Sequence, residues 1–212
     1  MQILIAKGFL FDMDGTLLDS HAKVEVVWRQ WCERCGIDLA AVMAIQQGVR
    51  TEDTIAKIAP QLDAAFEAAW VDQLESADCE GIVPIAGSAV LLRTIPQDRW
   101  TIATSATMPV ASMRLHHCHL PVPASMVTAE CVSAGKPDPQ IYRLAASRLG
   151  LDPADCIAFE DAPAGIHSAL AAGCRVVQIG GTQALHPDVV AHWQDFAAVR
   201  FAQHEGVLTL SF

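Results

Sequence analysis

The chain has 212 residues, of which 52% are hydrophobic and 18% charged, and its formal net charge is -10 at pH 7. This composition is typical of a globular protein with a large core and excludes a disordered chain. The acidic balance argues against partners such as nucleic acid or an anionic membrane surface. An anionic substrate would therefore have to be attracted by a local cation.

The apolar stretch at residues 1–11 is interrupted by Lys7 and is too short for a membrane-spanning helix. It also lacks a secretory cleavage pattern. The seven cysteines are odd in number and scattered, unlike the evenly paired cysteines of a secreted disulfide framework. We therefore expect a cytoplasmic protein.

Two cysteine- and histidine-containing segments could suggest metal sites. Cys32 and Cys35 have the CxxC spacing, but no second pair stands at zinc-ribbon distance, and buried thiols are the favoured interpretation. His116, His117 and His119 surround a cysteine at adjacent positions, where helical side chains point in different directions. A helix end with histidines that complement its dipole is favoured there over a metal site.

Apolar runs typical of strands alternate with segments of helical periodicity along most of the chain. Strands are expected at 7–11, 100–105, 125–128, 156–160 and 175–179, and helices near 87–94, 108–117, 138–149 and 163–172. Such alternation predicts an α/β fold, a Rossmann-like parallel-sheet core with helices on both faces. Trp193 and the run 207–212 could complete the sheet or meet a partner, so a monomer or a weak dimer is expected.

Residues 19–83 interrupt this rhythm because they show helical periodicity without a convincing strand. Their first apolar stripe consists of Val24, Val27, Trp28, Trp31, Cys32 and Cys35, and further helices are expected near 39–47, 51–59 and 63–76. We predict a catalytic core of residues 1–18 and 84–212 with an inserted helical cap of residues 19–83. A lid over a site is the functional interpretation, and a purely structural helical bundle is the alternative.

The first buried strand runs directly into the acidic turn Asp12-Met13-Asp14-Gly15-Thr16. Ligand sites of parallel sheets lie beyond the carboxyl ends of strands, where two close carboxylates need compensation. Taken alone, the segment could also be an ordinary polar turn. A calcium loop is excluded because Leu17 and Lys23 stand where glycine and glutamate are required.

Three other strand ends carry polar groups. Thr104, Ser105 and Ala106 can offer hydroxyl and backbone N–H donors to an anion, although a helix cap is the commoner reason for such residues. Lys136 stands between Gly and Pro and could supply a fixed positive charge or lie solvated on the surface. Glu160-Asp161 forms a second acidic pair, which could also compensate a helix dipole.

If these strand ends converge, Asp12, Asp14, Glu160 and Asp161 bring up to four negative charges into one crevice. A divalent cation together with Lys136 nearly neutralises them, and oxygen ligands suit Mg²⁺. The combination supplies a carboxylate nucleophile, a neighbouring acid and a positive clamp, which are the parts needed for phosphoryl transfer.

The acidic turn at 12–16, the pair Thr104-Ser105, the segment around Lys136 and the segment that begins at Glu160-Asp161 follow one another along the chain. In this order they resemble the four motifs of the haloacid dehalogenase superfamily of phosphohydrolases, and the insertion is similar to the family's alpha-helical cap. The resemblance implies that Asp12 is the nucleophile that becomes an aspartyl-phosphate and that Asp14 is the acid and base. It implies that Ser105, the N–H of Ala106 and Lys136 hold the phosphate. It further implies a Mg²⁺ cofactor bound by Asp12, the backbone carbonyl of Asp14, Asp161 and, directly or through water, Glu160.

Departures within the superfamily sharpen the expected reaction. Dehalogenases lack an aspartate at the Asp14 position, so carbon–halogen cleavage is not expected. Residues 48–54 resemble the β-phosphoglucomutase branch, but Val24 stands where that branch carries a histidine, so hydrolysis is preferred to transfer within a sugar. Arg50 in this segment is a candidate substrate contact or, equally, a surface ion-pair partner.

The sequence thus predicts a Mg²⁺-dependent phosphatase that hydrolyses small phosphorylated sugars or polyols, its small-molecule phosphate esters. The closest resemblance is to bacterial sugar phosphatases and to glycerol- and deoxysugar-phosphate phosphatases. A hexose-phosphate mutase is the alternative enzyme. A phospho-accepting signalling module is the non-enzymatic alternative, which would have no need of Asp14 or of a cap.

Overall fold

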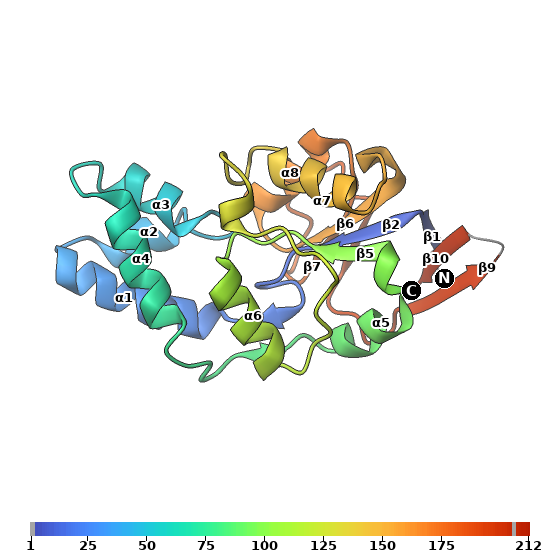
Figure 1. Ribbon diagram of the computed structural model, residues 1–212, viewed down its shortest axis with the longest axis horizontal. Coiled ribbons are helices and arrows are strands. Elements are labelled where there is room, and N and C mark those ends of the chain that lie inside the picture. The colour runs from blue at the N-terminus through green and yellow to red at the C-terminus, as the bar shows by residue number, and fades with distance from the viewer. Residues whose placement is uncertain (1–2, 205–206) are drawn as a thin grey trace.

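A parallel sheet forms the centre of the computed structural model, which describes residues 3–204 and 207–212 (Figure 1). Residues 1–2 and 205–206, which belong to the predicted core segments, lie outside the described part. The sheet has five strands in the order β5-β2-β6-β7-β8, all parallel. The strands are β2 (Gly8–Phe11), β5 (Trp100–Ile102), β6 (Cys156–Glu160), β7 (Arg175–Ile179) and β8 (Ala191–Trp193).

Helices cover both faces of this sheet, with α5 and α6 on one side and α7 and α8 on the other (Figure 1). These helices are α5 (Ser88–Thr94), α6 (Met108–His117), α7 (Gln140–Arg148) and α8 (Pro163–Ala172). Because successive strand residues point to opposite faces, Phe9 and Phe11 pack in the cluster that contains α5 and α6 residues, and Leu10 packs in the other. The predicted α/β class is confirmed.

A separate group of four helices follows β2 in the chain. They are α1 (His21–Cys35), α2 (Leu39–Met43), α3 (Thr51–Ile58) and α4 (Ala64–Glu75). The predicted stripe of α1 is confirmed, since Val27, Trp28, Trp31 and Cys32 lie buried in a cluster of this group's own. The short antiparallel pair β3 (Leu18–Asp19) and β4 (Val83–Pro84) leads the chain into the group and back.

The segment 125–128 was expected to be a strand, and this prediction is wrong. Only a single bridge joins Val127 to Ala103, beside β5. Pro121 and Pro123, just upstream, have no N–H to offer a strand ladder, and Ala129–Cys131 turns into a short 3-10 helix. Two further 3-10 turns precede β5 and β6, at Gln97–Arg99 and Pro153–Asp155.

The two ends of the chain form a second, smaller sheet. Strand β1 (Ile3–Ala6) pairs antiparallel with β10 (Val207–Ser211), which pairs with β9 (Arg200–His204). Trp193, in contrast, lies in the edge strand of the parallel sheet. Of the two elements that could have completed that sheet, β8 does so and the terminal run does not.

Of the two cysteines with the CxxC spacing, Cys32 is buried and Cys35 is partly buried. All seven cysteines are free thiols. Helix α6 ends at His117 with Cys118 as its cap, so the histidines do mark a helix end. Among the helices of the described residues, none combines the length and the apolar character needed to cross a membrane.

Candidate active site

The acidic turn after β2 is held in place by its own backbone and by the neighbouring strand. The Asp12 N–H donates to the Phe159 carbonyl at 3.0 Å, and the Leu17 N–H donates back to Met13 at 2.8 Å. Gly15 has a φ of 82°, in the left-handed region, and a Cβ there would overlap the Asp161 carboxylate. The glycine therefore lets two acidic strand ends approach each other closely.

Lys136 is buried between two carboxylates. Its Nζ lies 2.5 Å from Oδ1 of Asp12 and 2.6 Å from Oε1 of Glu160, and its side chain is 0% exposed. The hydroxyl of Tyr142 donates to the same Glu160 oxygen at 2.5 Å. Burial disfavours the charged lysine, but the two carboxylates outweigh it, so the pKa of Lys136 lies above its usual value. A buried cation thus lies beside Asp12, at the carboxyl end of β2.

Asp12, Glu160 and Asp161 form a cluster in which one carboxylate oxygen from each residue lies within 4.8 Å of the other two. Burial raises the pKa of Asp12 well above its usual value, against the opposing charge of Lys136. Burial and then the charge of Glu160 raise the pKa of Asp161 to about 7. Oε2 of Glu160 is buried and has no hydrogen-bond partner within residues 3–204 and 207–212. Three carboxylates that lie so close together, one of them with an unpaired oxygen atom, fit a divalent cation such as Mg²⁺, which prefers oxygen ligands.

The Asp14 side chain turns away from this cluster. Its Oδ1 accepts from Nη1 of Arg114 at 2.7 Å and from the Ser20 hydroxyl at 2.6 Å. Arg114 belongs to α6 and is only 2% exposed. Sequence reasoning missed this arginine, although its place beside Ala111 and Leu115 in the buried stripe of α6 was a usable signal.

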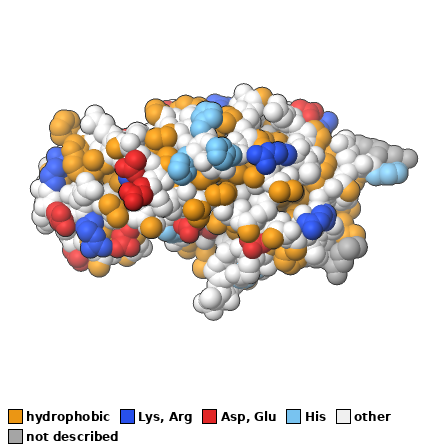
Figure 2. Space-filling model, turned by 90° about the horizontal axis from the view of Figure 1, so that it is seen from below, with side chains coloured by type: hydrophobic (Ala, Val, Ile, Leu, Met, Phe, Trp, Pro, Cys, Tyr) orange, Lys and Arg blue, Asp and Glu red, His pale blue; other side chains and the backbone are white. Residues whose placement is uncertain are grey.

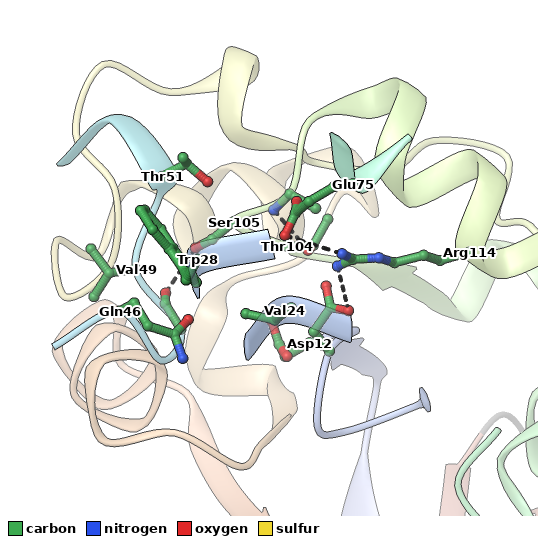
Figure 3. A pocket seen from close by; sticks show the side chains of 13 residues that line it. Asp12, Val24, Trp28, Gln46, Val49, Thr51, Glu75, Thr104, Ser105 and Arg114 are labelled. Atoms are coloured by element: carbon green, nitrogen blue, oxygen red, sulfur yellow. Dashed lines mark hydrogen bonds and ion pairs between the residues drawn. The ribbon is translucent and has the colours of Figure 1, made fainter. Parts of the chain in front are cut away.

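A cavity lies between the sheet and the helical group (Figure 3). The sheet side contributes Asp12, Asp14, Thr104, Ser105, Ala106 and Arg114, and the helical group contributes Val24, Trp28, Gln46, Gly48, Val49, Thr51 and Glu75. The structure therefore brings both predicted aspartates and the whole predicted anion-binding segment to one cavity. The carboxyl ends of the parallel strands β2 and β5 meet at this cavity. Lys136, Glu160 and Asp161 do not line it, but they lie close to Asp12, which does.

The predicted phosphate-holding donors have partners within the protein. The Ser105 hydroxyl donates to the Gly48 carbonyl at 2.8 Å, and the Ala106 N–H donates to Oγ1 of Thr104 at 3.1 Å. Gln47, next to Gly48, donates from its amide to Oδ2 of Asp161 at 3.0 Å. One loop of the helical group thus contacts both a predicted phosphate donor and a predicted metal ligand.

Arg50 lines two neighbouring cavities, one that Lys136 also lines and one that Ser105 also lines. Its guanidinium donates to the Asp53 carboxylate at 2.7 Å and to the Val132 carbonyl at 3.0 Å. It does not line the cavity that contains Asp12. In this arrangement Arg50 joins the helical group to the loop before Lys136.

Charged side chains are dispersed over the face that Figure 2 shows. Acidic and basic side chains lie among one another at the end formed by the helical group, and the basic side chains over the remainder stand apart. On this face, then, the surface of the described residues is mixed in sign, whereas the opposite charges of the site are buried.

Comparison with known proteins places the chain in a family. The model of the haloacid dehalogenase-like hydrolases matches residues 6–173, so the chain belongs to this family and is a hydrolase. Hexitol phosphatase A of Escherichia coli is 41% identical over 178 residues, 82% of each chain. Glycerol-1-phosphate phosphohydrolase 2 of Saccharomyces cerevisiae is 34% identical over 191 residues, 82% of this chain and 74% of that protein.

Solved structures share the fold at lower identity. CbbY from Rhodobacter sphaeroides, crystallised with phosphate, has a TM-score of 0.77 at 22% identity, over 91% of this chain and 96% of that one. The β-phosphoglucomutase of Clostridium difficile has a TM-score of 0.75 at 20% identity, over 91% and 92%. These likenesses show the architecture only.

Proposed function

We propose that this protein is a Mg²⁺-dependent phosphatase that hydrolyses small phosphorylated sugars or polyols. The observation that carries the proposal is the buried Lys136 ammonium between Asp12 and Glu160, with Asp161 completing an oxygen cluster. Only a site that handles both an anion and a cation needs this combination of buried charges. The names of the two relatives above, a hexitol phosphatase and a glycerol-phosphate phosphohydrolase, support the same substrate class.

The chemistry divides between the two aspartates of the turn. A carboxylate oxygen of Asp12 attacks phosphorus, and the bond from phosphorus to the sugar oxygen breaks. Asp14 gives its proton to the departing alkoxide and later takes a proton from the water that cleaves the aspartyl-phosphate. Lys136, Ser105 and the Ala106 N–H stabilise the charge on the transferred group. Asp12, the Asp14 carbonyl, Glu160 and Asp161 would hold Mg²⁺, which offsets charge on the phosphoryl oxygens when bound.

Residues 19–83 act in this proposal as a cap that completes the cavity. Seven of its lining residues come from that segment, including Trp28 and Glu75. Access for the substrate then requires the loop around Gly48 to release Ser105. Capping of this kind excludes water from the alkoxide while leaving room for a small leaving group.

A hexose-phosphate mutase is the second candidate, favoured by the architecture shared with β-phosphoglucomutase. Val24 weighs against it, because this aliphatic side chain lines the cavity and cannot move a proton to or from a sugar hydroxyl. The purified protein should release inorganic phosphate from a hexitol phosphate or glycerol phosphate in the presence of Mg²⁺ and not with EDTA. An isomerised sugar phosphate without free phosphate would favour the mutase.

A further inference from the structure

Two charged residues in the cavity wall have no part in the phosphate chemistry above. Glu75 is the last residue of α4, in the helical group, and Arg114 lies in α6, on the sheet side. Their side chains point toward each other across the cavity wall, as Figure 3 shows, with Nη2 of Arg114 3.3 Å from Oε1 of Glu75. The pair therefore spans the two halves of the cavity.

Arg114 has unused hydrogen-bonding capacity at this place. Its Nη1 donates to Asp14 at 2.7 Å, and its Nη2 forms only the longer ion pair of 3.3 Å with Glu75. Its Nε has no hydrogen-bond partner among the described residues, although the side chain is 2% exposed. A buried guanidinium with one unpaired N–H group and one long contact is incompletely satisfied, so the site favours a further oxygen atom beside it. The arginine lines the cavity, where a ligand could supply that oxygen.

Glu75 provides the complementary acceptor. Its side chain is 10% exposed, compared with 2% for Arg114. Burial raises the pKa of the Glu75 carboxyl, although the charge of Arg114 opposes this. Asp14 lies on the other side of the guanidinium, so two carboxylates surround one arginine. A second phosphate or a carboxylate would meet unfavourable like charge here, which leaves a neutral polar group as the best complement.

A hydroxyl group matches both residues at once, since its oxygen accepts from Nη2 of Arg114 while its proton is donated to the Glu75 carboxylate. We infer that Glu75 and Arg114 form a subsite that recognises a hydroxyl of the leaving alcohol in sugar and polyol phosphate substrates. The apolar side chains of Val24 and Trp28 line the same cavity and would cover the carbon chain of such an alcohol. This inference rests on the proposed function, which it extends from the phosphate to the alcohol.

The test compares glycerol 1-phosphate with n-propyl phosphate, which have the same carbon chain and differ in their hydroxyl groups. The measured quantity is the ratio of the two kcat/KM values. For the unaltered enzyme this ratio should exceed about tenfold, and Glu75→Ala should lower it by about tenfold or more, the effect of losing one hydrogen bond to a charged group. Glu75→Gln keeps a hydrogen-bonding group at this position and should recover part of the ratio.

Glu67→Gln is the matched control. Glu67 is a buried acid of the same helix, but it contacts Trp31 and Arg34 inside the helical group and does not line the cavity. Its substitution should leave the ratio unchanged, and thermal unfolding should confirm that all variants are folded. If Glu75→Ala leaves the ratio unchanged, or if Glu67→Gln lowers it equally, the subsite does not exist and the Glu75–Arg114 pair only joins the two halves.

The two proposals fail in different ways. An unaltered enzyme that releases no phosphate from sugar or polyol phosphates in the presence of Mg²⁺ would contradict the proposed function itself. One that hydrolyses them without preference over n-propyl phosphate would contradict the hydroxyl subsite. An unaltered enzyme that shows this preference and keeps it in Glu75→Ala would contradict only the hydroxyl subsite.

Discussion

Nζ of Lys136 lies 2.5 Å from Oδ1 of Asp12, and both side chains are buried. The two residues are 124 positions apart in the chain. A buried ion pair contributes little net stability to a fold, because the cost of desolvating both charges offsets their attraction. Its position at the carboxyl end of β2 instead suits a carboxylate whose orientation and ionisation must be controlled.

Asp12→Asn should remove the nucleophile and lower kcat by at least about a thousandfold, because an amide oxygen does not replace the carboxylate in attack on phosphorus. Steady-state release of phosphate from a polyol phosphate measures this. Asp19→Asn is the control, since Asp19 pairs with His21 at the surface. Substantial activity in the Asp12 variant would contradict the aspartyl-phosphate mechanism.

Asp14→Asn should separate the two chemical steps. A nitrophenyl leaving group needs no proton, so the variant should release about one equivalent of nitrophenolate rapidly and then stall, because the water that cleaves the intermediate lacks its base. Polyol phosphates should be slowed about a hundredfold to ten-thousandfold. Rapid-mixing absorbance measurements would reveal the burst. Steady turnover without a burst would assign the base to another residue.

Metal binding should change the pH dependence of stability. Burial raises the pKa of Asp161 from 3.8 to about 7 in the folded protein, so the metal-free folded state holds a proton that the unfolded chain releases. The stabilising contribution of this group is complete below about pH 4 and is lost as the pH rises through about 7. Denaturant unfolding of metal-free protein should show this loss, and Asp161→Asn should show a smaller one, since burial also raises the pKa of Asp12.

Added Mg²⁺ should raise the melting temperature more at pH 8 than at pH 5, because its carboxylate ligands must be ionised. The same titration on Asp161→Asn should show a much smaller shift. Equal Mg²⁺ stabilisation of both proteins would mean that the ion binds elsewhere.

Gly15→Ala tests the closeness of the two acidic strand ends. Gly15 and Gly36 both have positive φ, and a Cβ on Gly36 would have nothing within 4 Å, whereas on Gly15 it would overlap the Asp161 carboxylate. Both substitutions should cost about 1 kcal/mol of folding stability from backbone strain. Only Gly15→Ala should also displace Asp161 and lose both Mg²⁺ affinity and activity, as calorimetry and kinetics can show. Similar activities of the two variants would contradict the proposed close packing.

Much of the fold could be predicted because strong local patterns agreed with it. The run Gly8–Phe11 is buried on both faces, and the stripe of Trp28, Trp31 and their neighbours forms the core of the helical group. Segment 125–128 could not be predicted correctly, since its apolar character reflects burial beside β5 and not a strand ladder. The pairing of β1 with β10 joins the chain ends, which no local pattern reports.

The candidate site divides in the same way. Asp12, Glu160 and Asp161 were predictable because acidic pairs at strand ends have few structural explanations, and the structure brings them together. Lys136 was predictable from its place between Gly and Pro, although the segment before it is not a strand, and it lies beside Asp12 and Glu160. Arg114 and Glu75 were not predicted, because each is one charged residue on an amphipathic helix. Arg50 remains a prediction as a substrate contact, and its guanidinium contacts Asp53 and the Val132 carbonyl here.

By itself, the sequence determined the α/β class and the acidic and basic residues of the proposed phosphate site, because the strands of a parallel sheet all have their carboxyl ends at one edge. Only the tertiary structure decided which residues surround the proposed position of the leaving alcohol. Glu75 and Arg114 lie on different helices of different halves, and their side chains face each other only after the helical group has packed over the sheet. Contacts between distant elements depend on how those elements pack, which is not encoded in the periodicity of either segment.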